Sequence, residues 1–368
     1  MSETTDVFVA GGGPAGLAVA IAARKYGFRV TLADADAPPI DKACGEGLLP
    51  NALDALERLG VELSASESYA LRGLRFVDGA VAAQAGFPGR PGRGVRRKTL
   101  HTKMVERAAT CGVRLLWRTR VTGLDDEGVS LEGSRVRARW VVGADGANSL
   151  VRRWSGLDDQ VQRDVRFAYR RHYRMPPWTD CVEVHWGDRL QAYITPVSAT
   201  EVCVAVISRN PRLRLDDAVR LFPVLAARLR EGEPSSAERG GITSMLKLRR
   251  VCRGRVALTG DAAGCVDAIT GEGLGLAFQE AAALAEALAA NDLPLYETSH
   301  RGLARRTSLM AKSLLALDAF PALRRRAMRT FENQPQIFAR LLASHVGSGS
   351  DADLLAAGAR LGWHLITA

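Results

Sequence analysis

A glycine-rich turn near the N-terminus has the spacing of a phosphate-binding loop. Gly11, Gly13 and Gly16 form the pattern GxGxxG after a short apolar run, and an alanine-rich, helix-favouring segment follows. In such a turn the glycines allow a tight bend, close approach of a pyrophosphate and close helix–strand packing. Asp34 ends the next β-branched run, where a carboxylate can accept hydrogen bonds from ribose hydroxyls. The pattern predicts a strand–helix–strand unit that binds a dinucleotide at a helix N-terminus.

A lone cysteine, Cys44, follows this unit in the segment DKACGEGLLP. Its thiol is a candidate for direct chemistry beside a cofactor, since the neighbouring Lys42 would favour a thiolate. A free cysteine also serves as a small apolar residue with no reactivity. Both interpretations stay open from the sequence.

Two later segments repeat the arrangement of an apolar strand that ends in glycine and aspartate. The first, 138–153, contains Asp145 and Gly146, and the second, 255–288, contains Gly260 and Asp261 before a glycine-spaced loop and a long helix. With GxGxxG, they resemble the FAD-binding motifs of the superfamily typified by para-hydroxybenzoate hydroxylase. That superfamily includes aromatic hydroxylases, geranylgeranyl reductases and flavin-dependent halogenases. The resemblance covers roughly residues 5–50, 93–153 and 250–290.

The resemblance implies FAD as the cofactor and assigns contacts to particular residues. It places the glycine turn at the pyrophosphate, Asp34 at the ribose, Val121 at the adenine, and the last glycine loop at the pyrimidine edge of the flavin, where a helix N-terminus would stabilise negative charge. Asp145 has a structural turn as its alternative role. The implied cofactor-binding residues are Gly11, Gly13, Pro14, Ala15, Gly16, Asp34, Cys44, Gly45, Arg97, Val121, Asp145, Gly260, Asp261, Gly271, Gly273, Leu274 and Gly275.

The fold expected is α/β: a Rossmann-like FAD-binding domain with an inserted, mainly antiparallel β-sheet substrate domain and a helical C-terminal segment. Strand-like runs of residues between the cofactor motifs predict the inserted sheet. The expected boundaries are 1–69, 91–160 and 250–290 for the FAD domain, 70–90 and 161–249 for the sheet, and 291–368 for the helices.

The inserted sheet supplies the candidate pocket residues, Trp186, Tyr193, Thr195 and Pro196, and a candidate acid or base, His185. Ordinary sheet packing is the alternative for each of them. Halogenases of the superfamily carry WxWxIP on this sheet, whereas the corresponding stretch here is QAYITPVS. The missing tryptophans argue against halogenation.

The resemblance favours a monooxygenase of secondary metabolism that uses NAD(P)H, as a transient reductant, and O₂ on an aromatic or other lipophilic small molecule through a flavin C4a-hydroperoxide. The alternative is a reductase of alkene bonds in a prenyl or polyketide-type lipid, because CGEG and TGEG (Thr270–Gly273) resemble geranylgeranyl reductases. A halogenase or a flavin-binding protein without turnover is less favoured.

Composition limits the partners. The net charge is +10, with arginines gathered at 324–326, but no nucleic-acid-binding motif accompanies them and aromatic residues make up 6%, so nucleic acid is not expected. A solvated basic face and peripheral contact of the basic C-terminal helices with a membrane are the alternatives. The six cysteines lack CxxC spacing, so we expect no metal site. The expected location is cytoplasmic, with or without membrane association.

Overall fold

The first sheet is mostly parallel and is built around the N-terminal strand. The computed structural model describes residues 3–349 and 351–367. Central strand β1 is completely buried at Val7–Val9, as expected for a parallel strand covered on both faces. Across the sheet the order is β18 (Cys252–Arg253), β19 (Val256–Leu258), β11 (Ser134–Gly143), β1 (Glu3–Ala10), β2 (Val30–Asp34) and β8 (Arg114–Trp117), with the hairpin β9 (Val121–Asp125) and β10 (Gly128–Leu131) added to β11.

Helices cover this sheet and bring the glycine loops to one edge of it. Helix α1 (Pro14–Lys25) follows β1 at once, with proline in its first turn, where a missing N–H costs nothing. The other helices around this sheet are α2 (Pro50–Arg58), α3 (Arg97–Thr110), α4 (Leu150–Trp154) and α7 (Gly273–Ala289). The short 3₁₀ helices η1 (Gly260–Ala262) and η2 (Ala268–Thr270) lie between β19 and α7.

The second sheet is largely antiparallel and draws its strands from separate parts of the chain. Long strand β12 pairs with β15 and β17, and β13 pairs in parallel with β5. Its order is β20 (Gly264–Cys265), β17 (Arg239–Leu248), β12 (Gln160–Arg174), β15 (Glu201–Ser208), β14 (Leu190–Ser198), β13 (Cys181–Trp186), β5 (Gly73–Asp78) and β6 (Val81–Gly86), with β16 (Glu233–Pro234) beside β12. A small sheet of β3 (Gly47–Leu48), β7 (Gly92–Gly94) and β4 (Tyr69–Leu71) completes the strands described.

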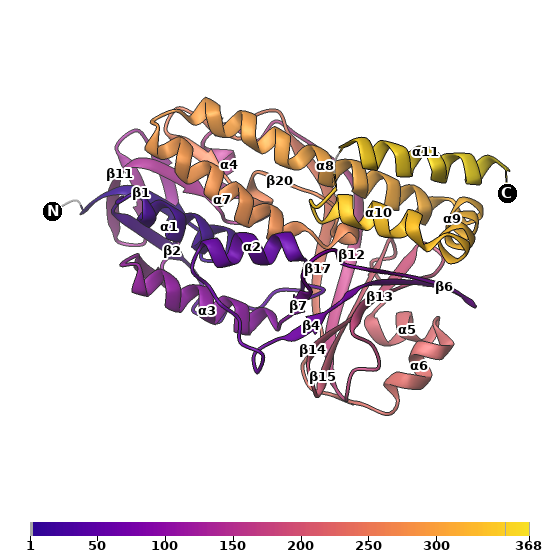
Figure 1. The fold of residues 1–368 in the computed structure, drawn as a ribbon. Coiled ribbons are helices and arrows are strands. Elements are labelled where there is room, and N and C mark those ends of the chain that lie inside the picture. The colour runs from indigo at the N-terminus through magenta and orange to yellow at the C-terminus, as the bar shows by residue number, and fades with distance from the viewer. Residues whose placement is uncertain (1–2, 350, 368) are drawn as a thin grey trace.

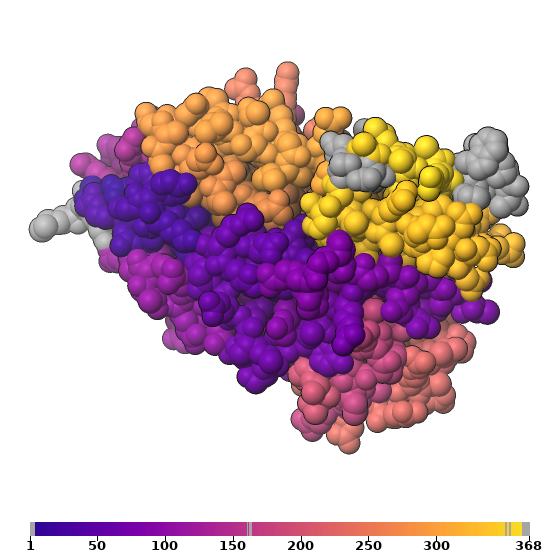
Figure 2. Space-filling model, viewed as in Figure 1, coloured from indigo at the N-terminus to yellow at the C-terminus, as the bar shows by residue number. Residues whose placement is uncertain are grey.

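Each face of the second sheet packs against its own helices. On one face, α5 (Leu215–Arg220) and α6 (Pro223–Leu229) cover an apolar cluster that contains Ala192 and Ile194. The C-terminal helices α8 (Leu293–Ala319), α9 (Pro321–Asn333), α10 (Pro335–His345) and α11 (Asp351–Thr367) lie on the opposite side of the molecule (Figure 1). In the space-filling view, the described parts of α9 to α11 form a yellow surface that adjoins the orange surface of α7 and α8 (Figure 2). The predicted fold class is confirmed.

Candidate active site

A cavity of about 990 Å³ lies where the glycine loops of the first sheet meet the second sheet and the C-terminal helices. Its lining comes from segments that are far apart in the sequence. At one end it is lined by Gly13–Ala15, Lys42–Gly47, Arg97, Gly260–Asp261, Thr270, Gly271, Gly273 and Leu274. Elsewhere it is lined mainly by apolar residues of β5, β13, β15 and the helices α8 to α11.

The first glycine turn combines crowded and open positions. Gly11 has a φ of +109°, and a Cβ there would lie 2.4 Å from the Ala144 carbonyl oxygen. A Cβ on Gly16 would lie 1.9 Å from the Gly11 oxygen, so helix and turn meet at backbone contact. Around Gly13 the described atoms leave open space within 4 Å, and Gly13, Pro14 and Ala15 all line the cavity. Gly11 and Gly16 therefore shape the turn, and Gly13 faces the space that a phosphate would enter.

Asp34 already holds the turn in place. One of its carboxylate oxygens accepts a hydrogen bond from the Gly12 N–H at 2.6 Å, and the other accepts one from the Asp36 N–H at 2.8 Å. The ring of Trp117 covers Gly12, since a Cβ there would lie 2.3 Å from it. Trp117 pairs directly with Asp34 across β2 and β8, whereas Val121 begins β9 and does not line the cavity. The residue beside Asp34 is thus Trp117, which was not among the residues predicted from the sequence.

The last glycine loop opens toward the cavity at its start and packs away from it at its end. Gly271 has a φ of +68°, and both Gly271 and Gly273 face open space among the described atoms. Leu274 also lines the cavity. A Cβ on Gly275, however, would lie 2.9 Å from Ala52 Cβ, so this glycine permits contact between α7 and α2. Gly260 and Asp261 line the same end of the cavity, and the Gly260 N–H donates to Glu280 at 2.8 Å.

Asp145 acts as a helix cap in this structure. Its carboxylate accepts hydrogen bonds from the backbone N–H groups of Leu150 and Val151, at 2.7 and 3.1 Å, and from the Ser149 hydroxyl. These bonds satisfy donors at the start of α4. The neighbouring Ala144 and Gly146 line the cavity, but Asp145 does not.

Cys44 lies in the cavity wall, half-buried, with Gly45 beside it. The Arg97 guanidinium approaches the Cys44 sulfur at 3.8 Å, and the backbone N–H of Arg97 donates to Glu46 at 3.0 Å. Arg97 therefore fixes the loop from the start of α3 and also lines the cavity. Chemical participation of the thiol stays a prediction.

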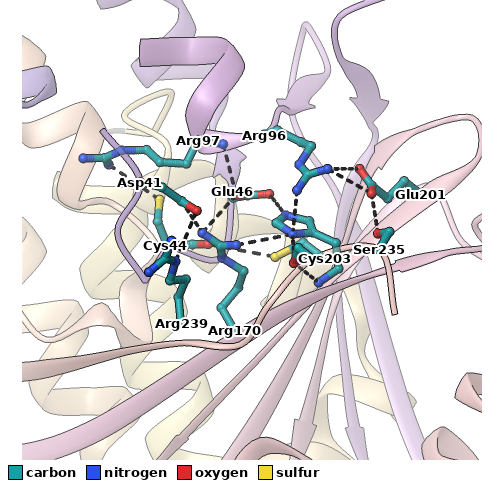
Figure 3. Close-up of polar contacts among 12 residues, drawn as sticks. Asp41, Cys44, Glu46, Arg96, Arg97, Arg170, Glu201, Cys203, Ser235 and Arg239 are labelled. Atoms are coloured by element: carbon teal, nitrogen blue, oxygen red, sulfur yellow. Dashed lines mark hydrogen bonds and ion pairs between the residues drawn. The ribbon is translucent and has the colours of Figure 1, made fainter. Parts of the chain in front are cut away.

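Beneath the Cys44 loop lies a buried network of charges that the sequence did not reveal (Figure 3). Glu46 accepts a hydrogen bond from His172 Nε2 at 2.6 Å, and the Arg170 guanidinium lies 3.9 Å from Glu46 and 2.5 Å from Asp41. The Nδ1 atom of His172 faces guanidinium donors of Arg96 and Arg170, so it accepts and the Nε2–H donates. Glu46 takes a φ of +55°, and these bonds offset the strain of that conformation.

The neighbouring thiol of Cys203 belongs to the same buried cluster. Burial raises the pKa of Cys203 well above its usual range, and the charge of Glu46 adds to this effect. Ligand atoms of Glu46, His172 and Cys203 lie within 4.8 Å of one another. The guanidinium groups of Arg170 and Arg96 already supply positive charge there, which makes the cluster an ion-pair network rather than a cation cage.

The second sheet places the predicted pocket residues on different faces. Tyr193 and Thr195 of β14 line the cavity. His185 does not: its ring contacts Phe222 on the helix α5–α6 side, and its Nε2 lies 3.3 Å from Glu183. Trp186 packs against Phe76, with ring centroids 5.7 Å apart, and it lies outside the cavity lining, as does Pro196. The placement expected for His185, Trp186 and Pro196 is corrected accordingly.

A second unpredicted pair, Glu272 and His345, lies at the last glycine loop. Burial raises the pKa of Glu272 to about 8 and lowers the pKa of His345 to about 4. His345 Nε2 lies 3.0 Å from the Thr270 carbonyl oxygen, and its Nδ1 lies 3.3 Å from the Glu272 carboxyl. Both groups are therefore neutral near pH 7. Glu46 and Glu272 share the sequence Gly-Glu-Gly, an acid between glycines that was the available signal for both.

The residues at the glycine end fit FAD. Open glycine positions at 13, 271 and 273, the N-termini of α1 and α7, and the Arg97 guanidinium together form an anion-binding cradle beside a cavity large enough for a flat ring system.

Replacing Gly13 with valine should abolish FAD binding without unfolding the chain. The added side chain would project into the space reserved for the pyrophosphate, while the backbone at Gly13 is not left-handed. The absorbance of bound flavin in purified protein measures this. Gly302→Val, an equally open position on α8, should keep the yellow colour. Full FAD occupancy in Gly13→Val would contradict the assignment.

The Glu272 carboxyl should make stability fall as pH rises. Between its ordinary pKa of 4.5 and about 8, the native state holds a proton that the unfolded state has released. His345 has the opposite effect, but only between about 4 and its ordinary 6.5. From pH 6.5 to 8, wild type should therefore lose about 2 kcal/mol of unfolding free energy relative to Glu272→Gln.

Urea unfolding of both proteins at the two pH values measures that difference. Glu286→Gln, at an exposed position on helix α7, whose N-cap residue is Glu272, serves as the control and should follow wild type. Parallel pH profiles for wild type and Glu272→Gln would show that the carboxyl is not held neutral.

Comparisons with known proteins agree with this geometry. The family described as FAD binding domain matches residues 4–211. The chain is 29% identical over 331 residues to a menaquinone reductase of Mycolicibacterium smegmatis, covering 81% of this chain and 80% of that protein. It is 26% identical over 303 residues to digeranylgeranylglycerophospholipid reductase 1 of Methanothermobacter thermautotrophicus, covering 74% of each. A flavoprotein/dehydrogenase structure from Cytophaga hutchinsonii superposes with a TM-score of 0.81 at 19% identity, over 94% of this chain and 93% of that one.

The glycine turns, the cavity beside them and these matches lead to one conclusion: the protein is an FAD-dependent oxidoreductase and belongs to the FAD binding domain family.

Proposed function

We propose that this enzyme reduces carbon–carbon double bonds in a lipophilic, prenyl-type substrate, with NAD(P)H as the transient source of electrons. The observation that carries the proposal is the long apolar part of the cavity. Beyond the glycine loops its walls are side chains such as Phe76, Leu314, Phe331, Phe338 and Leu342. Burial of each CH₂ group of a prenyl chain against such walls contributes roughly 0.8 kcal/mol.

The relatives support reduction over the oxygen transfer that the sequence had favoured. Both curated relatives described above are named reductases, and one is named for a quinone and the other for a digeranylgeranyl lipid. Monooxygenation of a lipophilic molecule is the competing reaction that the experiment below can reveal.

The chain's own residues position the substrate and keep water out. Bound FAD would supply hydride transfer at its ring system. The apolar walls from β5, β13 and the C-terminal helices hold a prenyl chain and exclude water from the reacting bond. The charged groups Glu46, Arg170 and Arg97 lie at the glycine end, where they fix the Cys44 loop.

The direct test mixes the photoreduced enzyme with a short-chain prenylated naphthoquinone without oxygen. The expected product keeps two added hydrogens in its prenyl chain after the quinol has been reoxidised in air, as located by fragment masses in mass spectrometry. Reduction of the quinone ring alone adds the same mass, but exposure to air reverses it. Leu314→Gln, inside the cavity, should slow the reaction at least several-fold, whereas Leu221→Gln, on the exposed α5–α6 side, should not. A product that forms only with oxygen and has gained an oxygen atom would overturn reduction in favour of monooxygenation.

We also propose that the cavity opens to an anionic membrane surface. Within the described residues, no helix combines the length and apolarity needed to span a bilayer. Leu309 of α8, Leu355 of α11 and Ile242 of β17 nevertheless line the cavity while 56, 74 and 67% exposed. Exposed Arg305 and Lys312 flank Leu309 on α8. Apolar side chains beside basic ones are the pattern of a helix that lies in a lipid interface.

Of the arginines gathered at 324–326 on α9, Arg324 is buried, whereas Arg325 and Arg326 are exposed. Arg324 is 5% exposed, and its guanidinium pairs with Asp78 at 3.1 Å and lies over the Trp186 ring. This arginine therefore joins α9 to β5. The surface proposed for membrane contact is defined by Leu309, Leu355, Arg305 and Lys312.

Sedimentation with vesicles tests this surface. The protein should bind vesicles of phosphatidylcholine with phosphatidylglycerol better than phosphatidylcholine alone, and Leu309→Ser with Leu355→Ser should weaken binding about tenfold. Leu221→Ser, also exposed but beside α5, is the matched control. Equal binding by the double variant and wild type would exclude this surface.

A further inference from the structure

Two hydroxyl groups in the cavity wall have no hydrogen-bond partner among the described residues. They belong to Tyr193 and Thr195, which are 8 and 1% exposed. Both residues line the cavity and stand two positions apart on β14, so their side chains share one face of the sheet. The alternate residues Ala192 and Ile194 belong to the apolar cluster under α5 and α6.

An unpaired buried hydroxyl is costly. Such a group gives up its hydrogen bonds to water on folding and gains none in return, and here two lie together in a largely apolar wall. Valine or phenylalanine at these positions would avoid the cost. Two such hydroxyls near each other therefore indicate that a polar atom of a bound ligand supplies their missing hydrogen-bond partner.

The surroundings of Tyr193 keep its hydroxyl available as a donor. Burial raises the pKa of Tyr193, so the hydroxyl stays protonated. The nearby carboxylates have other partners: Asp267 pairs with Arg166, and Asp318 accepts a hydrogen bond from Gln191. The Tyr193 hydroxyl is therefore buried in the cavity wall with its proton uncommitted.

Thr195 places this pair next to the Cys44 loop. A Cβ on Gly47 would lie 3.8 Å from the Thr195 methyl group, and one on Gly94 would lie 3.4 Å from it. Tyr193 belongs to the apolar cluster that contains Leu49 and Ile269 and extends to Phe331 and Phe338 of the C-terminal helices. The pair thus spans the border between the glycine end of the cavity and its apolar part.

We propose that Tyr193 and Thr195 form a binding subsite for a carbonyl or hydroxyl oxygen on an otherwise apolar substrate. This inference rests on the proposed function and narrows its substrate class to lipids with an oxygen-bearing head, such as a quinone, a ketone or a phenol. Hydrogen bonds to that oxygen would hold the head at the border while the prenyl chain fills the apolar part. Such a site discriminates against hydrocarbons of the same shape, because they leave both hydroxyls unpaired.

Calorimetric titration of the oxidised, FAD-loaded enzyme tests the subsite with two probes of one ring skeleton, 2-methyl-1,4-naphthoquinone and 2-methylnaphthalene. Wild type should bind the quinone more tightly. Tyr193→Phe and Thr195→Val should each weaken quinone binding roughly 3- to 10-fold, the value of one hydrogen bond, and leave hydrocarbon binding unchanged or tighter. Thr195→Ser should restore quinone binding.

Tyr173→Phe is the matched control, since Tyr173 is equally buried on β12 but belongs to the cluster on the other face of the sheet. Unchanged quinone affinity in both Tyr193→Phe and Thr195→Val would overturn the subsite and leave the proposed function standing. Equal losses for both probes would assign these residues to packing and overturn it too. Failure of wild type to bind either probe would instead remove the lipophilic substrate class, and the subsite with it.

Discussion

Two buried guanidinium groups on β12 determine how the halves of this protein meet. Arg166 and Arg170 are 0 and 1% exposed, and a charge removed from water to that extent needs a partner. Their spacing puts both side chains on one face of the strand. Arg170 finds its partners in the loop after β2, at Asp41 and Glu46, and Arg166 finds Asp267 in the segment that precedes η2. The second sheet is thereby tied to both loops that form the glycine end of the cavity.

This arrangement explains why the polar and apolar parts of the cavity are separate. Charged groups that must be neutralised gather where β12 meets the loops, and Gln191 and Asp318 extend the chain of contacts to α8. The rest of the cavity wall, from β13 and most of α10, is largely apolar, with the Tyr193 and Thr195 hydroxyls and the α10 end at Ser344 and His345 among its polar exceptions. A cofactor with phosphates and a flat ring suits the first part, and a hydrocarbon chain suits the second. The cavity is divided in this way because a buried charged group needs a partner of opposite charge, and the buried arginines of β12 find such partners where this strand meets the two loops.

The sequence was sufficient to predict motifs whose residues are close together in the chain. It was not sufficient to predict contacts between residues that are far apart in the chain. Gly11, Gly13 and Gly16 could be recognised because turn, helix start and strand lie within a few residues of one another. Glu46 and His172 are 126 residues apart, so no local pattern could join them. His185 was misplaced for a different reason: β13 alternates apolar and polar residues, and it is the apolar Val182 and Val184 that line the cavity, whereas Glu183 and His185 lie on the other face. On β14 the period of two separates Tyr193 and Thr195, which line the cavity, from Pro196, but it does not show which of the two faces meets the cavity.

The two Gly-Glu-Gly loops show why residue type alone does not determine chemistry. Glu46 is surrounded by donors, namely the Arg97 N–H, His172 and the Arg170 guanidinium, so its negative charge is balanced where it lies. Glu272 is buried about as deeply, and this burial raises its pKa to about 8 although the Thr307 hydroxyl and the charge of Arg306 act in the opposite direction. One loop is therefore tied to the second sheet by ion pairs, and the other carries a neutral acid at the start of the helix that would face the flavin. The same three residues differ in their surroundings because β12 places Arg170 and His172 in direct contact with Glu46, whereas desolvation dominates at Glu272.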